Sequence, residues 1–317
     1  MTTAAKVAGF VAALAAVFVL ALGVGSVLGP VAEPSAAAHE ARGAGAAGAD
    51  GQGEQATSDQ SDLPAGLMSS QDGYTLSLAE PTAAAGRDIP VRFTVTGPDG
   101  RPVTAYDVAH GKRLHLVAVR RDATGFQHVH PRLSRHGTWS TALDLTPGQW
   151  RLFADFRASA GEALTLGTDL AVAGSYRPAV GAGESRTAEV DGYTVTLDGD
   201  LAGGADATLT LSAERDGEPV TDLEPYLGAY GHLVALRAGD LAYLHVHPDG
   251  TPGDGRTRPG PLVAFHAAVP SPSTYHLYLD FQHRGVVHTA AFEVRSAGRA
   301  GGTVPAATGS GDGHTTH

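Results

Sequence analysis

Cysteine is missing from this sequence of 317 residues, and methionine is almost missing. Without cysteine the chain can form no disulfide, no thiolate metal site, no cysteine nucleophile and no lipid-modified N-terminal cysteine. Its two methionines, Met1 and Met68, are too few for a thioether-rich cuprous site. Any transition-metal ion bound by this chain would therefore have to be held by imidazole and carboxylate groups.

Positive charge is also in short supply. Lys and Arg number 22 against 33 Asp and Glu, which gives a formal net charge of −11. A DNA or RNA partner is excluded on this ground, because phosphate binding needs a basic face. Hydrophobic residues make up 42% and charged residues 17% of the chain, so a packed core is expected. The length allows two domains with flanking segments.

The longest apolar run lies near the N-terminus. Residues 7–29 carry no charge and are long enough to span a bilayer, which takes about 20 apolar residues. One lysine precedes the run and acidic residues follow it, so we predict a signal-anchor or transmembrane helix within residues 1–30. The alternative is a cleaved signal peptide, with the alanines at 36–38 as the cleavage site. Both interpretations predict a membrane-tethered or secreted protein outside the cytoplasm.

Three segments read as connections rather than as folded structure. Residues 31–68 are rich in Ala, Gly, Glu, Ser and Gln, and residues 298–317 are similarly poor in large apolar side chains. Such segments cannot bury enough surface to offset their chain entropy. We predict a disordered linker at 31–68, a short linker at 176–188 and a disordered tail at 298–317.

An internal duplication fills the remainder of the chain. Its first half contains "DGYTLSL", "DGRPVT", "HLVAVRRDATGFQHVHP" and "PGQWRLFADF"; its second half contains "DGYTVTL", "DGEPVT", "HLVALRAGDLAYLHVHP" and "PSTYHLYLDF" in the same order. The interval from the first histidine of the long phrase to its His-Val-His pair is the same in both copies. Repeats of roughly a hundred residues have the size of a sandwich domain.

The fold class follows from the pattern within each copy. Short β-rich runs such as "YTLSL", "IPVRFTV" and "RLHLVAV" alternate with Gly- and Pro-containing turns, and no helical periodicity is visible beyond the N-terminal segment. We predict an all-β protein with two tandem Ig-like or fibronectin-like antiparallel β-sandwiches. Their predicted bounds are 69–175 and 189–297.

The repeated histidines are the candidate functional residues. His128 and His130 are two positions apart on a predicted strand, so their side chains leave the same face about 7 Å apart. His115 lies on the partner strand of the predicted hairpin. Three imidazoles meet if the register places His115 opposite this pair, and the parity of the turn decides whether it does.

Each copy also supplies an aspartate, in "RLFADF" and "HLYLDF". Asp155 and Asp280 can act as a fourth ligand or as the acceptor that fixes a histidine tautomer. Imidazole with carboxylate suits Cu(II) or Zn(II) and disfavours Ca(II) and Mg(II). The candidate metal ligands are His115, His128, His130 and Asp155 in the first copy and His232, His245, His247 and Asp280 in the second.

A structural role is the alternative for all of these residues. A histidine on a strand is usually a packing or hydrogen-bonding residue, and these could pin the hairpin against the strand that carries the aspartate. The comparison between copies favours metal binding: "GRDIPVRFTV" and "GADATLTLSA" have diverged, whereas the histidines and the aspartate recur. Packing alone would tolerate Thr, Gln or Tyr at some of these positions.

The phrases "HLVAV", "HVHP" and "PG-x-W-x-L-F-A-D-F", with their second-copy counterparts, resemble those of membrane-anchored or secreted bacterial heavy-metal-binding proteins, some from copper-handling contexts. The resemblance covers residues from about 70 to 296. It implies binding or buffering of metal ions outside the cytoplasm, with a metal-handling protein of the envelope as a possible partner.

The sequence is therefore compatible with three functions. The first is a non-enzymatic envelope protein that sequesters or delivers Cu(II) or Zn(II), bound about one ion per domain. The second is an adhesion or scaffold module whose histidines are structural. The third is a metalloenzyme with three histidines and an open coordination position. The third is disfavoured, since the sequence has no nucleophile elbow, phosphate loop or paired-carboxylate motif.

Overall fold

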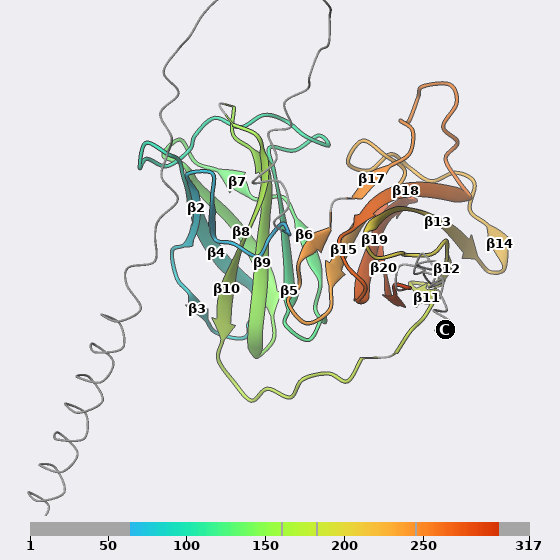
Figure 1. Cartoon of the computed structure of the whole chain (residues 1–317), viewed down its shortest axis with the longest axis horizontal. Coiled ribbons are helices and arrows are strands. Elements are labelled where there is room, and N and C mark those ends of the chain that lie inside the picture. Colours follow the sequence, from blue (N-terminus) through green and yellow to red (C-terminus); the bar gives the residue numbers. More distant parts are fainter. Residues whose placement is uncertain (1–63, 160, 182, 245, 298–317) are drawn as a thin grey trace, which may run out of the picture. The chain divides into compact units, whose positions relative to one another are not determined.

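Two β-sandwiches, one for each sequence repeat, carry the regular structure of the computed structural model, which describes residues 64–159, 161–181, 183–244 and 246–297 (Figure 1). Every regular element within those residues is a β-strand, so the all-β prediction is confirmed for them. They contain no helix that could cross a membrane. The predicted anchor, the tail at 298–317 and most of the predicted linker at 31–68 lie outside the described residues.

The first repeat folds into two five-stranded sheets, with the strand orders β1-β2-β4-β8-β7 and β3-β10-β9-β5-β6. The strands are β1 (Ser70–Gln71), β2 (Tyr74–Leu78), β3 (Thr82–Ala83), β4 (Gly86–Thr96), β5 (Leu114–Arg120), β6 (Gln127–Val129), β7 (Arg132–Leu133), β8 (Thr138–Leu145), β9 (Gly148–Arg157) and β10 (Ala163–Val172).

The second repeat has the matching orders β11-β12-β13-β18-β17, with β14 added beside β13, and β16-β15-β19-β20. Its strands are β11 (Thr187–Val190), β12 (Tyr193–Asp198), β13 (Ala205–Arg215), β14 (Glu218–Pro219), β15 (His232–Arg237), β16 (Tyr243–Leu244), β17 (Val246–Pro248), β18 (Leu262–Val269), β19 (Thr274–His283) and β20 (Val286–Arg295).

These strand orders are those of an immunoglobulin-like sandwich. In the first repeat, β2, β4, β8 and β7 stand where an immunoglobulin domain has strands A, B, E and D, and β5, β9 and β10 stand where it has C, F and G. β6 takes the place of the additional strand C′ of variable-type domains. The second repeat has the same arrangement in β12, β13, β18 and β17 and in β16, β15, β19 and β20. The prediction of two tandem Ig-like sandwiches is confirmed.

Each sandwich has its own apolar core between its two sheets. Strand β8 shows how the sequence builds it, because its buried residues Trp139, Leu143 and Leu145 alternate with more exposed ones. The first core is organised around Phe93, Trp139 and Trp150 and the second around Tyr193, Phe265 and Tyr275, all six being 1% exposed or less.

A third apolar cluster joins the two repeats. Its members are Val117, Val119, Phe153, Val234, Leu236, Leu241 and Tyr278, with Phe126 and Tyr243 packed against it. They come from β5, β9 and the β5–β6 hairpin of the first repeat and from β15, β19 and the β15–β16 hairpin of the second. Both repeats belong to one compact unit, Asp59–His317. Strands β5 and β15 are therefore buried on both faces, one face in their own core and the other between the repeats.

Equivalent residues of the two repeats exchange aromatic contacts across this cluster. Phe126 stacks on Tyr278 with ring centroids 4.0 Å apart and an interplanar angle of 6°. Tyr243 and Phe153, which occupy the same places in the opposite repeats, lie 5.5 Å apart at 54°. This reciprocal pairing indicates an approximate two-fold axis between the repeats, since each repeat uses the same surface patch to contact the other.

Candidate functional site

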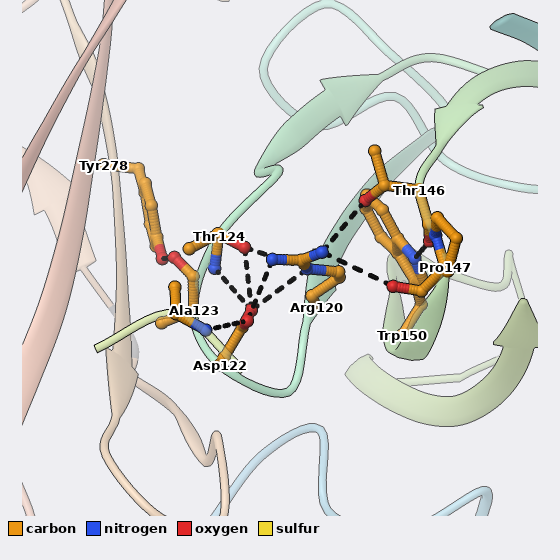
Figure 2. A network of polar contacts seen from close by, with 9 residues as sticks. Arg120, Asp122, Ala123, Thr124, Thr146, Pro147, Trp150 and Tyr278 are labelled. Atoms are coloured by element: carbon orange, nitrogen blue, oxygen red, sulfur yellow. Dashed lines mark hydrogen bonds and ion pairs between the residues drawn. The ribbon is translucent and has the colours of Figure 1, made fainter. Parts of the chain in front are cut away.

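The β5–β6 hairpin, which carries His128, is held by a polar clamp at its turn. Arg120 donates to both carboxylate oxygens of Asp122, at 3.1 and 2.9 Å, and Asp122 also accepts from the Thr124 hydroxyl at 2.7 Å (Figure 2). From the second repeat, the Tyr278 hydroxyl donates to the Ala123 carbonyl oxygen at 2.6 Å. The hairpin turn is thus tied to both repeats.

The turn has little freedom to adopt another shape. Ala123 has a φ of 61° and Gly125 a φ of 68°, both in the left-handed region. A Cβ on Gly125 would lie 2.7 Å from the indole of Trp150, so only glycine fits there without displacing a buried ring. The path of the chain into β6 is consequently well determined.

The register of this hairpin brings the histidines to one face. Val117 is opposite His128 and Leu116 is opposite Val129, so His128 shares a face with Val117 and His115. This is the face that looks toward the second repeat, since Val117 belongs to the inter-repeat cluster. The turn parity that the sequence left open therefore brings the three imidazoles together.

His115, His128 and His130 form one group of nitrogen atoms. One ring nitrogen from each lies within 4.8 Å of the others. The His115 and His128 ring centroids are 5.3 Å apart, and the His130 ring is 5.0 Å from each. His115 is 3% exposed, and the side chain of His128 is 1% exposed.

The protons on two of these rings can be assigned from their outer partners. Nε2 of His115 lies 3.1 Å from the Ala109 carbonyl oxygen, and Nδ1 of His128 lies 2.8 Å from Oδ2 of Asp280. A carbonyl and a carboxylate only accept, so each of these nitrogens must carry the proton. A neutral imidazole carries one proton, so the inner nitrogens, Nδ1 of His115 and Nε2 of His128, are then unprotonated.

These two inner nitrogens face each other at 3.1 Å. In neutral rings both present lone pairs, and a hydrogen bond between them is impossible without an added proton. Nε2 of His130 is buried nearby and has no hydrogen-bond partner. A buried polar atom without a partner costs about 1–3 kcal/mol. A cation at this point, either a proton or a metal ion, would satisfy the facing nitrogens.

Burial disfavours an added proton on His115 and on His130. Burial lowers the pKa of His115 to about 4; the hydrogen bond to Ala109 opposes this effect, and His128, His110 and Lys112 add to it. The pKa of His130 is lowered to about 3, again chiefly by burial. Both rings are therefore neutral at pH 7, which is the form that binds a metal ion.

The second repeat contributes two of its own candidates to this cluster. His232 stacks on His115 with centroids 5.6 Å apart and an interplanar angle of 6°, and burial lowers its pKa well below the usual value. Asp280 accepts from His128 and also from the Thr289 hydroxyl at 2.6 Å. The ring nitrogens of His232 do not belong to the group formed by His115, His128 and His130. Asp280 contacts this group only through the outer ring nitrogen of His128.

A cavity of about 260 Å³ opens beside His115. Its lining includes Asp155 of the first repeat and His232 and His247 of the second. Asp155 is the cross-strand neighbour of His115, just as Asp280 is that of His232. The structure therefore places Asp155 beside the cavity rather than among the converging nitrogens.

Of the second His-Val-His pair, the structure describes His247. His247 is exposed and lies opposite His266 on β18 in the sheet register. His245 lies outside the described residues. Within the described part of the chain, the site thus draws its converging nitrogens from the first repeat and its supporting groups from the second.

Two nearby residues were not among the predicted ligands. His110 occupies a tight turn at a φ of 50°, and its ring is 6.1 Å from His115 and 6.0 Å from His232. Tyr226, at the equivalent turn of the second repeat, lies 6.5 Å from His130. The sequence did carry a signal for the shared face: the runs at 114–119 and 233–236 are almost continuously apolar, which indicates strands covered on both sides.

Comparison with known proteins identifies the repeated domain. Residues 69–174 and 188–298 each match the family profile described as "Domain of unknown function (DUF8832)", and the chain belongs to that family. No curated protein matches the sequence. The family description names no metal, so the expected kinship with heavy-metal-binding proteins stays a prediction.

Several solved structures show a distant likeness. The Escherichia coli adhesin FdeC is 12% identical, with 72% of this chain and 65% of that chain covered and a TM-score of 0.23. Yersinia pseudotuberculosis InvD is 16% identical over 75% and 61%, with a TM-score of 0.22. A putative membrane-anchored protein of Corynebacterium diphtheriae is 11% identical over 72% and 59%, with a TM-score of 0.22. The chain spans less than two thirds of each, and likenesses at these scores carry no functional argument.

Proposed function

Taking the chain as two DUF8832 domains, we propose that it binds one transition-metal ion, Cu(II) or Zn(II), between its repeats. The ligands are Nδ1 of His115, Nε2 of His128 and a ring nitrogen of His130. The observation that carries this proposal is the 3.1 Å approach of two nitrogens that each present a lone pair.

The distance itself supports a shared ion. Two nitrogens bound to one ion at 2.0–2.1 Å are about 2.9–3.4 Å apart for angles between 90° and tetrahedral. The 3.1 Å between His115 and His128 lies inside this interval. The third imidazole, His130, has a ring nitrogen within 4.8 Å of the other two, which leaves it close enough to complete the ligand set.

The chemistry of the donors narrows the choice of ion. Three imidazoles without a thiolate suit Cu(II) and Zn(II), and the absence of carboxylate oxygens among the converging atoms disfavours Ca(II) and Mg(II). Asp280 serves as the outer acceptor that orients one ligand, a common arrangement around metal-bound histidine. The role we propose is sequestration or delivery of the ion outside the cytoplasm, without catalysis.

Metal content measured after dialysis against a competing chelator tests the proposal. The wild-type protein is expected to retain one ion of Zn(II) or Cu(II) per chain, and His115→Ala/His128→Ala to retain none. His136→Ala, which removes an exposed imidazole outside the cluster, is the matched control and retains the ion. At a hundred times its dissociation constant, the ion is expected to stabilise the fold by about 2.7 kcal/mol.

Two results of the metal analysis would contradict this function. A wild-type protein without a bound ion, or a double variant that retains one, removes the site. Two ions per wild-type chain would restore the expectation of one site per repeat and overturn the shared site.

A second candidate, an adhesion or scaffold module, is favoured by the hydrogen bond between His128 and Asp280. It crosses the repeats with both side chains almost fully buried, at 1% and 3% exposure. In this function the cluster joins two Ig-like domains into a rigid unit and a proton takes the place of the ion. The thermal midpoint would then be insensitive to Zn(II) and Cu(II).

A further inference from the structure

We propose that ion binding and docking of the second repeat are coupled, so that the ion locks the two sandwiches together. This inference rests on the proposed function. The coupling residue is Asp280, a positioning residue of the second repeat that acts on a ligand of the first.

The coupling follows from the two nitrogens of one imidazole. With Nδ1–H donated to Asp280, the lone pair of His128 is on Nε2, which is the atom directed at His115. Without the carboxylate, the ring is free to carry its proton on either nitrogen and to rotate. Outer acceptors of this kind are typically worth 10–100-fold in metal affinity.

Asp280 can provide this acceptor only when the repeats are docked. It lies in the middle of β19, paired with His232 on β15 and with Thr289 on β20. Its second oxygen accepts from the Thr289 hydroxyl, and the residue is 2% exposed. The carboxylate is therefore fixed to the second sandwich and moves with it.

The same interface also reaches the hairpin that carries His128. Tyr278, two residues before Asp280, donates to Ala123 at the hairpin turn and stacks on Phe126. Docking of the second repeat thus orders the hairpin at its turn and the imidazole at its inner end. By thermodynamic reciprocity, an ion that favours this arrangement strengthens the docking by the same factor.

A pair of Tyr→Phe variants of the full chain tests the coupling. Tyr278→Phe removes a hydroxyl that donates at 2.6 Å to a carbonyl of the other repeat. Tyr275→Phe removes a hydroxyl that donates at 2.6 Å to Ser271 within its own repeat. The dissociation constant for Zn(II), measured by chelator competition, is expected to rise about 3- to 10-fold in Tyr278→Phe and to stay unchanged in Tyr275→Phe.

A second pair addresses the carboxylate itself. Asp280→Asn is expected to weaken Zn(II) binding 10- to 100-fold. Asp191→Asn is the control, because Asp191 accepts from Nδ1 of His288 at the same distance of 2.8 Å, away from the cluster. In the wild type, Zn(II) is also expected to slow amide hydrogen exchange in β15 and β19.

The failure of the coupling can be told apart from the failure of the site. If the wild type binds Zn(II) and loses it in His115→Ala/His128→Ala, the site stands. Wild-type affinity in both Tyr278→Phe and Asp280→Asn, with no change in exchange of β15 and β19, would then overturn the coupling alone. No binding in the wild type overturns both.

Discussion

The described histidines of the two repeats lie in different surroundings, although the sequence pattern is the same. In the first, the side chains of His115 and His128 are nearly inaccessible and face each other at 3.1 Å. In the second, His232 stacks against the cluster, whereas His247 is exposed and lies opposite His266. The two aspartates share one contact, since Asp155 accepts from the Thr165 hydroxyl at 3.1 Å and Asp280 from the Thr289 hydroxyl at 2.6 Å.

The interface between the repeats is approximately two-fold symmetric in its aromatic residues. Aromatic residues meet their counterparts reciprocally across the interface, as Phe126 and Tyr278 do on one side and Tyr243 and Phe153 on the other. Among the described residues, the ring nitrogens that lie within 4.8 Å of one another all come from the first repeat. An ion bound away from the two-fold axis needs one complete ligand set, and the first repeat offers it.

The largest expected effect concerns the shared face. Val117→Asp and Val234→Asp each place a carboxylate among residues that are now 2% and 0% exposed. Both are expected to lower the free energy of unfolding by about 3 kcal/mol or more, because an unpaired charge would be buried. Urea unfolding provides the measurement, with Ser140→Asp on the exposed face of β8 as the control. Costs below about 0.5 kcal/mol at both positions would mean that this face is open to water and the repeats are not docked.

A smaller effect separates the buried His128 from the exposed His247. In metal-free protein, His128→Ala leaves Asp280 buried without its imidazole donor, and we expect a loss of about 1–3 kcal/mol. His247→Ala alters an exposed side chain and is expected to stay within about 0.5 kcal/mol. Equal losses of free energy in chemical denaturation would contradict the buried hydrogen bond between His128 and Asp280.

The smallest effect compares the arginine clamps of the hairpins. Burial alone would raise the pKa of Asp122, but hydrogen bonds from Ala179, Thr124 and Arg120 lower it to about 2. Its stabilising contribution, about 2 kcal/mol, is complete above the unfolded-state pKa near 4 and is lost as pH falls through about 2. Asp122→Asn is therefore expected to be destabilising at pH 7 and nearly neutral near pH 2.

The equivalent clamp in the second repeat provides the comparison. The hydrogen bond from Arg237 lowers the pKa of Asp240, but the Asp240 side chain is 41% exposed, against 5% for Asp122. Solvent screening reduces the effect, so Asp240→Asn is expected to cost less than 1 kcal/mol. A series of urea midpoints from pH 7 to about pH 2 measures both contributions. A larger pH dependence for Asp240 would contradict the ranking.

Much of the fold was predictable because it depends on local patterns. Alternating burial along β8 follows from side-chain periodicity, and the turns at the Asp-Gly dipeptides follow from backbone preferences. The duplication shows each pattern twice. The sequence predicted that His115, His128 and His130 would converge in one of the two possible hairpin registers. This convergence depends on the register that sets Val117 opposite His128, which a turn of unknown parity leaves open.

The contribution of the second repeat could not be predicted in the same way. The contact between His128 and Asp280 joins residues 152 positions apart and depends on how two folded domains dock. Docking depends on how side chains of both repeats, such as Val119, Leu236 and Tyr278, pack together. The periodicity of a single strand does not predict that packing. The recurrence of the aspartate in both copies pointed to its importance but not to its partner.

Anomalous diffraction at the zinc edge, from crystals of the protein grown with Zn(II), tests the central claim most directly. One peak is expected about 2.0–2.1 Å from Nδ1 of His115, Nε2 of His128 and a ring nitrogen of His130. No peak at this position, or a peak only beside the exposed His247 and His266, would contradict it.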